Sequence, residues 1–244
     1  ASGSIVGNIF RNNTASTSTD GFGGGLYLEG GGANNMQVQA NQIVSNTATR
    51  NLKARGRGGG ISIHLRAQLA NNIIAENYAH TNGSGICHMG AEAPVGYVNN
   101  TIAFNQGASA VYIAEPPVQA APLGAQAVYT PAFTNTLLAG NEGFAVEVGL
   151  STTVAFQATL WHGNGGLITG PGQAHIGGIN VYADPGFVAE SDYHIRAGSP
   201  AQDAGLPAGV TSDVDGEPRP YGRRYDIGAD EVQASALYLP LLMR

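Results

Sequence analysis

One short pattern of polar and apolar residues recurs along residues 7–164. Its strong copies cover residues 8–13, 41–46, 72–77 and 100–105, and weaker copies cover residues 136–141 and 159–164. The third position is apolar in every copy, while its neighbours vary: Phe10, Ile43, Ile74, Ile102, Leu138 and Trp161. A position that stays apolar in each repeat predicts a stack of inward-facing side chains.

The last position of this pattern is asparagine in every copy: Asn13, Asn46, Asn77, Asn105, Asn141 and Asn164. Side-chain amides stacked in register form ladders of hydrogen bonds between neighbouring repeats. Asparagine also tolerates a left-handed backbone better than other non-glycine residues. We therefore expect these residues to build a ladder and to occupy the left-handed bends.

A second pattern, in which small residues precede a short alternating strand, follows the strong copies of the first. It covers residues 23–28, 58–63, 83–88 and 108–113. No 3.6-residue periodicity indicates helices, and the glycines would weaken them. Strands this short cannot bury an apolar side alone, but stacked coils bury it together. The sequence predicts an all-β, right-handed parallel β-helix of about six coils over residues 1–170.

The predicted coils differ in length. The repeated asparagines lie 33, 31, 28, 36 and 23 residues apart. Solenoids accommodate such variation in loops, and long insertions fall at about residues 14–22, 47–57 and 114–130.

Composition excludes several classes of protein. Only 11% of the residues are charged, 36 are glycine, and the net charge is −6, without a sustained basic stripe. A nucleic-acid partner is therefore not expected. Cys87 is the single cysteine, so an intrachain disulfide and a cysteine-rich zinc site are excluded. No stretch approaches the ~20 apolar residues that span a bilayer, so no transmembrane segment is predicted.

Residues 171–244 form a second, non-repetitive module. Ten of the seventeen acidic residues lie between Asp184 and Glu231. Its landmarks are the segments 184–187, 192–195, 198–205, 213–220 and 226–231. This series resembles the C-terminal region of bacterial right-handed parallel β-helix repeat proteins of the choice-of-anchor (Q-type) family, and the coils resemble their repeats. The resemblance implies a secreted, cell-surface protein and no single activity.

The module is expected to cap the open C-terminal end of the β-helix, because uncovered strand edges invite aggregation. Arg219, Arg223 and Arg224 lie among its carboxylates, so salt bridges between loops are one interpretation. A structural calcium site at Asp213 and Asp215 is the alternative, since two carboxylates before a glycine open many calcium loops. No other cofactor is predicted.

Alignment of the glycine-containing patterns predicts candidate binding residues on the coils. Tyr27, Ser62, Cys87 and Tyr112 should share one outward column, and Glu29, His64 and Met89 the next. Glu29 and His64 would then be neighbours, as a surface contact or an acid/base pair. The insertion with Arg50, Lys53, Arg55 and Arg57 would wall a groove for an acidic glycan or be a solvated loop. Tyr27 and Tyr112 would stack on sugar rings or serve as ordinary strand aromatics.

Three functions agree with this arrangement. The preferred one is a non-enzymatic structural or adhesive protein of the cell surface. It would assemble end to end, or continue upstream coils, because residues 1–7 enter the repeat without a polar cap. The second is a polysaccharide lyase or hydrolase at Glu29, His64 and the basic insertion. The third is a carbohydrate-binding protein without chemistry. No aspartate lies between Asp20 and Asp184, which disfavours a glycosidase on the coils.

Overall fold

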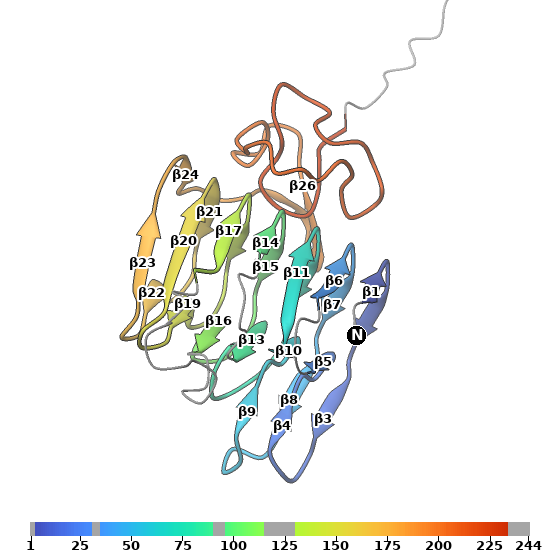
Figure 1. Cartoon of the computed structure of the whole chain (residues 1–244). Helices are drawn as coiled ribbons and strands as arrows, with labels where there is room; N and C mark the ends of the chain where they lie inside the picture. The colour runs from blue at the N-terminus through green and yellow to red at the C-terminus, as the bar shows by residue number, and fades with distance from the viewer. Residues whose placement is uncertain (1–2, 31–34, 90–95, 115–129, 234–244) are drawn as a thin grey trace, which may run out of the picture.

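A computed structural model describes residues 3–30, 35–89, 96–114 and 130–233 of the chain (Figure 1). No helix occurs in these residues, and three long parallel sheets dominate the structure. The first sheet contains β1 (Gly3–Val6), β6 (Asn35–Gln39), β11 (Arg66–Ala70), β14 (Gly96–Val98), β17 (Ala132–Thr134), β20 (Thr153–Gln157) and β23 (Gln173–Ile176). The second contains β2 (Ile9–Arg11), β7 (Gln42–Val44), β12 (Ile73–Ala75), β15 (Thr101–Ala103), β18 (Leu137–Ala139), β21 (Thr159–His162) and β24 (Asn180–Val181). The third contains β5 (Leu26–Glu29), β10 (Ile61–His64), β13 (Ile86–Met89), β16 (Ser109–Ala114), β19 (Phe144–Val148) and β22 (Gly166–Thr169).

The chain visits the three sheets in turn, so the fold is the expected parallel β-helix. The third sheet has 6 strands, which gives six complete coils, and β23 and β24 begin a seventh. The long insertions of the first two coils pair with each other, β3 (Thr14–Ser16) with β8 (Thr47–Thr49) and β4 (Gly21–Phe22) with β9 (Gly56–Arg57). Most of the insertion at 114–130 lies outside the described residues.

The interior of the coils is the predicted apolar stack. Phe10, Ile43, Ile74, Ile102, Leu138 and Trp161 are register partners in the second sheet and belong to the main hydrophobic core. Aromatic rings from the first sheet continue this stack towards Trp161. The ring centroids of Tyr97 and Phe133 lie 4.3 Å apart, and those of Phe133 and Phe156 lie 5.0 Å apart. The core is therefore a continuous column rather than one compact cluster.

The predicted asparagine ladder is confirmed. From Asn13 through Asn164, each side-chain Nδ2 donates to the Oδ1 of the asparagine in the next coil, at 2.7–3.1 Å. A second ladder, which was not predicted, lies at the first position of the same repeat. Asn8, Asn41, Asn72 and Asn100 make the same contacts at 3.2, 3.0 and 2.9 Å.

The left-handed bends do not lie where they were predicted. The ladder asparagines are not in that conformation; the residue before each of them is, as at Ser45 (φ 58°), Glu76 (φ 56°) and Phe104 (φ 53°). This residue ends the strand and turns the chain. The following asparagine then directs its amide into the interior, where Asn46, Asn77 and Asn105 are fully buried.

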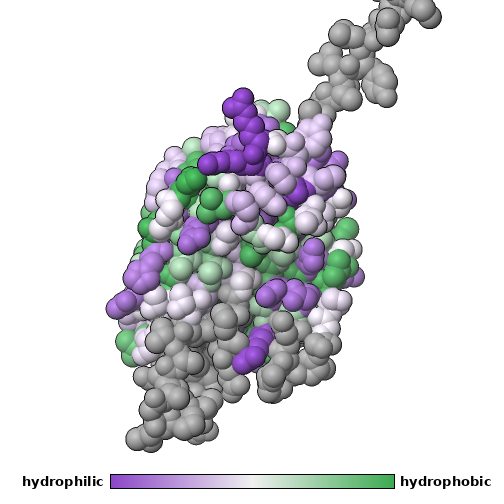
Figure 2. All heavy atoms as spheres, turned by 45° about the horizontal axis from the view of Figure 1, so that its top comes forward, coloured by the Kyte–Doolittle hydropathy of each residue, from purple (hydrophilic) through white to green (hydrophobic). Residues whose placement is uncertain are grey.

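The C-terminal module also lies elsewhere than expected. Its first described strands, β23 and β24, continue the coils, whereas the described residues from Phe187 to Val232 lie along the side of the coils (Figure 1) and pack on the outer face of the second sheet. Besides β23 and β24, its described strands are a short antiparallel pair, β25 (Phe187–Ala189) and β26 (Asp192–Ile195). Figure 2, in which this region comes forward, shows a mostly hydrophilic surface with scattered apolar residues. The module thus shields the flank of the β-helix.

The outer face of the second sheet is apolar where the module covers it. The residues on either side of the inward stack are buried against the module: Val44, Ile73, Ala75, Ala103, Leu137, Ala139 and Leu160. In the first coil the same column ends in Ile9, which is 68% exposed. A strand buried on both faces explains why the repeat reads as a continuous apolar run.

Asparagines at the bends fix the module to the coils. Asn71, Asn99 and Asn135 have left-handed backbones and donate their side-chain amides to module carbonyls, those of Ser212, Asp226 (3.1 Å) and Leu206 (2.8 Å). Each of these residues precedes the first position of the repeat, which is Asn72, Asn100 and Thr136. At each of these bends, the asparagine binds the module and the residue that follows it is buried in the coils.

Candidate functional site

The outer face of the third sheet carries the predicted columns. Tyr27 pairs in register with Ser62, Ser62 with Cys87, and Cys87 with Tyr112, and Glu29 pairs with His64. Tyr27 is 45% exposed, whereas Ser62 and Cys87 are fully buried. The predicted register is confirmed, but the column is not an uninterrupted accessible strip.

His64 contacts Tyr27 and Ser62 beside Glu29. Its Nε2 lies 3.2 Å from Ser62 Oγ, and its ring centroid lies 5.2 Å from that of Tyr27. Burial lowers the pKa of His64, although the Glu29 carboxylate opposes this effect. The imidazole is therefore neutral at pH 7. The rings of His64 and Tyr27 therefore lie side by side on the outer face of the third sheet, beside the Ser62 hydroxyl.

Cys87 and His88 face opposite sides of β13. Burial raises the pKa of the Cys87 thiol to about 12, so it carries no thiolate at neutral pH. His88 points into the core near the Tyr97 hydroxyl (3.3 Å), and burial lowers its pKa to about 3. These two residues form no catalytic dyad.

Tyr112 is half-buried and lies in register between Cys87 and Glu147. Glu147 Oε2 accepts hydrogen bonds from Ser109 Oγ (2.9 Å) and Asn82 Nδ2 (3.1 Å). This carboxylate is thus held by neighbouring coils.

The arginines of the basic insertion lie in different surroundings. Arg55 forms a 2.6 Å ion pair with Asp20 and lies over the Phe22 ring, with its guanidinium 5.9 Å from the ring centroid. Arg57 reaches towards the third sheet, and its guanidinium lies 3.4 Å from Met89 Sδ. Arg50 instead lines a hollow at the opposite end of the insertion. The insertion does not form one basic wall beside His64.

The hollow beside Arg50 has a volume of about 430 Å³. It is lined by Thr47, Arg50, Leu52, Glu76, Tyr78 and Gln106. Thr47, Tyr78 and Gln106 are neighbours in successive coils through isolated β-bridges. Stacking of the coils therefore brings a guanidinium, a carboxylate, an amide and a phenol ring together on one surface.

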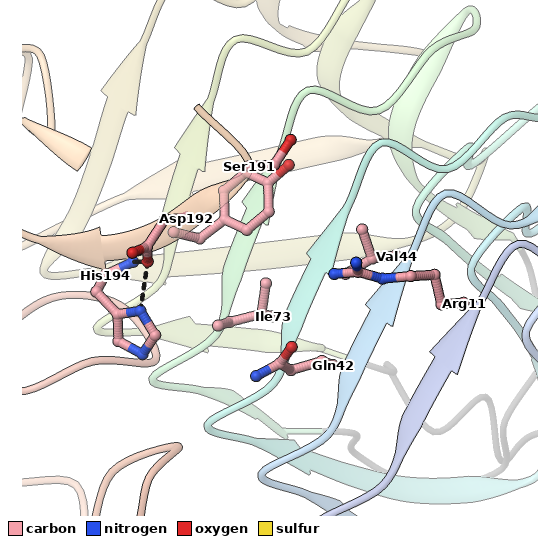
Figure 3. A pocket seen from close by; sticks show the side chains of 8 residues that line it. Arg11, Gln42, Val44, Ile73, Ser191, Asp192 and His194 are labelled. Atoms are coloured by element: carbon pink, nitrogen blue, oxygen red, sulfur yellow. Dashed lines mark hydrogen bonds and ion pairs between the residues drawn. The ribbon is translucent and has the colours of Figure 1, made fainter. Parts of the chain in front are cut away.

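A second hollow, of about 300 Å³, lies between the second sheet and the module (Figure 3). The coils contribute Arg11, Gln42, Val44 and Ile73, and the module contributes Ser191, Asp192, Tyr193 and His194. The module's position along the flank creates this hollow, so no local sequence pattern predicted it.

Glu76 connects the two hollows. Its Oε1 accepts hydrogen bonds from Tyr193 (2.6 Å) and Ser191 (2.8 Å), and its Oε2 accepts one from Ser45 (2.7 Å). The Tyr193 hydrogen bond, with those from Ser45 and Ser191, lowers the pKa of Glu76 despite its partial burial. A glutamate at a left-handed bend, where other coils have Asn12, Ser45 or Phe104, was the available sequence signal for this site.

The predicted calcium ligands have different roles. Asp213 is buried, and its Oδ1 accepts the backbone N–H groups of Asp215 (2.9 Å) and Glu217 (2.8 Å). Its Oδ2 accepts the N–H of Glu231 at 3.1 Å. Asp215 is exposed and lies 2.8 Å from His194 Nε2. Asp213 therefore organises a turn, and the Asp215 carboxylate lies beside His194.

A buried ion pair holds the centre of the module. Arg219 Nη1 lies 2.9 Å from Glu231 Oε2, and both side chains are almost completely buried. Glu231 also accepts the N–H groups of Tyr221 and Asp226, both at 3.0 Å. This agrees with the salt-bridge interpretation for Arg219, whereas Arg223 and Arg224 are exposed.

No family model, curated protein or solved structure matches this chain. Among the described residues, no helix is long and apolar enough to cross a membrane.

Proposed function

We propose that this protein is an extracellular, non-enzymatic adhesive protein that binds polysaccharide on the flank of its β-helix. The observation that carries this proposal is the hollow lined by Arg50, Glu76, Tyr78 and Gln106. Sugar-binding sites combine an aromatic ring with a few oriented polar groups, and this hollow offers both. Arg50 would contact a carboxylate or hydroxyl group of the glycan.

The bonding of Glu76 supports binding rather than hydrolysis. Its two oxygens accept three hydroxyl hydrogen bonds, so the carboxylate is used to fix the module against the coils. A glycosidase needs two carboxylates roughly 5–10 Å apart. Glu76 is the only carboxylate among the described residues lining this hollow.

The third sheet supports the same interpretation. The carboxylates of its described strands are Glu29 and Glu147, which belong to the first and fifth coils. Four coil spacings of about 4.8 Å separate them by roughly 19 Å. This separation is too large for a pair that flanks one glycosidic bond.

The test measures binding and cleavage together. The full chain is titrated with polygalacturonate and, separately, with neutral xylan, and released reducing ends are measured. Tyr78→Ala and Arg50→Gln should each weaken binding at least tenfold, and no products should appear. The matched controls are Tyr182→Ala and Arg223→Gln, at exposed positions outside the hollow. Equal binding by all variants would reject this site, and product release would reject the non-enzymatic function.

A further inference from the structure

A cluster of metal-binding side chains lies on the module, apart from the proposed glycan site. One ligand atom from each of His194, Asp215 and Asp230 can be chosen so that all three lie within 4.8 Å of one another. The residues come from β26, from the turn after Asp213 and from the segment before Glu231. Three separate segments therefore converge on one position.

The imidazole of His194 is oriented towards this position. Asp192 Oδ1 lies 2.5 Å from Nδ1 and occupies that side of the ring, while Nε2 faces Asp215 Oδ2 at 2.8 Å. Figure 3 shows Asp192 beside one ring nitrogen of His194, with the other nitrogen turned away from it. A carboxylate behind a histidine in this way fixes the tautomer and ring orientation of metal-ligating histidines.

A backbone hydrogen bond to one carboxylate oxygen holds the Asp230 side chain in place. Its Oδ2 accepts the backbone N–H of Ile195 at 2.8 Å, and the residue is only 7% exposed. Within the part of the chain that the structure describes, the hydrogen bond of Asp230 uses Oδ2, so Oδ1 is the oxygen that would turn to a cation. The backbone hydrogen bond thus positions the Asp230 carboxylate and leaves its other oxygen for a cation.

The charges around the cluster favour a divalent cation. Asp192, Asp215 and Asp230 surround one imidazole, and buried Asp213 adds to the negative field at Asp230. The buried guanidinium of Arg219 is bound to Glu231. Even a fully protonated His194 would leave these carboxylates in excess.

We propose that His194, Asp215 and Asp230 bind a zinc ion, with Asp192 as the residue that positions His194. Zinc takes imidazole nitrogen and carboxylate oxygen at about 2.0–2.2 Å in tetrahedral geometry, which places the ligand atoms about 3.3 Å apart. The three ligand atoms already lie within 4.8 Å of one another, and a bound ion would draw them closer. Calcium requires six to eight oxygen ligands and does not favour imidazole. The ion would join the hairpin of β25 and β26 to two loops of the module.

The experiment uses the full chain after treatment with EDTA and dialysis. Calorimetric titration with zinc chloride should give one ion per chain, and magnesium or calcium chloride should bind at least tenfold more weakly. His194→Ala and Asp215→Asn should each weaken zinc binding more than tenfold. Asp192→Asn should weaken it about 10- to 100-fold, as loss of a positioning carboxylate does. His175→Ala is the matched control, because His175 is exposed on β23.

Cobalt provides a readout that does not depend on affinity alone. The cobalt-loaded wild type should show the visible absorption of a four-coordinate ion, and Asp215→Asn should change that spectrum while the far-ultraviolet circular dichroism stays unchanged. Because Asp215 is exposed, its conservative replacement tests the site even if His194→Ala fails to fold. Zinc binding that is unchanged in Asp215→Asn, or reduced equally in His175→Ala, would overturn the proposal. Preference for calcium would overturn the assignment to zinc.

Discussion

The Tyr193 hydroxyl donates a 2.6 Å hydrogen bond to Glu76 Oε1, across 117 positions of sequence. Tyr193 is only 4% exposed, and it packs with Phe187 and Phe104 where the module meets the coils. This contact attaches the hairpin of the module to a bend of the β-helix.

Replacement of Tyr193 by phenylalanine isolates that attachment. The ring packing is kept, but the carboxylate loses its shortest hydrogen bond, so the variant should lose about 1–2 kcal/mol of stability. Urea unfolding measures the difference. Tyr221→Phe removes an exposed hydroxyl and should change the midpoint little; equal losses in both variants would argue against a role for the Glu76 contact.

The centre and the end of an asparagine ladder should respond differently to mutation. Asn77→Ala removes the acceptor for both N–H donors of Asn46, and also the donor to Ile43 and Asn105. Since these groups are buried, the expected loss is about 3–5 kcal/mol. Asn13→Ala, at the exposed end, should cost less than about 1 kcal/mol. Similar denaturation midpoints for the two variants would contradict a structural role for the ladder interior.

The apolar outer face of the second sheet should be as important as its inner face. Leu137 is fully buried under the module, so Leu137→Ala should cost about 2–5 kcal/mol. Ile9 occupies the same column in the first coil but is exposed, and Ile9→Ala should change stability by less than about 0.5 kcal/mol. Thermal and urea unfolding compare the pair. A small effect at Leu137 would show that the module does not pack there in solution.

Asp226 should make stability fall as the pH rises. Burial raises its pKa to about 6, against two backbone hydrogen bonds that favour the charged form. The folded pKa exceeds the unfolded value of 3.8, so its stabilisation is complete below pH 4 and is lost as the pH passes 6. Raising the pKa from 3.8 to about 6 corresponds to about 3 kcal/mol.

The measurement for Asp226 compares urea unfolding of the wild type and Asp226→Asn from pH 3.5 to 7.5. The variant loses one acceptor and should be less stable at low pH, but the difference between the two proteins should shrink as the pH rises. A constant difference across this range would show that the carboxyl does not titrate with a raised pKa.

The repeat predicted the β-helix because its signal is local and occurs in every coil. The inward column ending at Trp161, the ladder ending at Asn164 and the pairing of Glu29 with His64 all follow from the register of the repeat. The ladder from Asn8 to Asn100 was equally visible at the first position of the repeat, but it was not recognised.

The position of the module could not be predicted in the same way. Covering the open end and covering the flank both shelter apolar surface, and the choice depends on contacts between distant residues. The runs Ile73–Ala75 and Leu137–Ala139 did contain a signal, since consecutive apolar residues in a strand indicate burial on both faces. Glu76 and the hollows became apparent only with the flank position of the module.

The number of residues between the first and the last asparagine of each repeat is fixed, and this limits how the protein can be redesigned. The spacing is the same for Asn8 and Asn13, Asn41 and Asn46, and Asn72 and Asn77, whereas the loops between coils vary freely. Inserting one residue inside that interval would shift the amide at its end out of register with the amides of the neighbouring coils. Duplicating one whole coil would instead preserve both ladders and lengthen the rod by about 4.8 Å, so coil number is the natural unit for changing its reach.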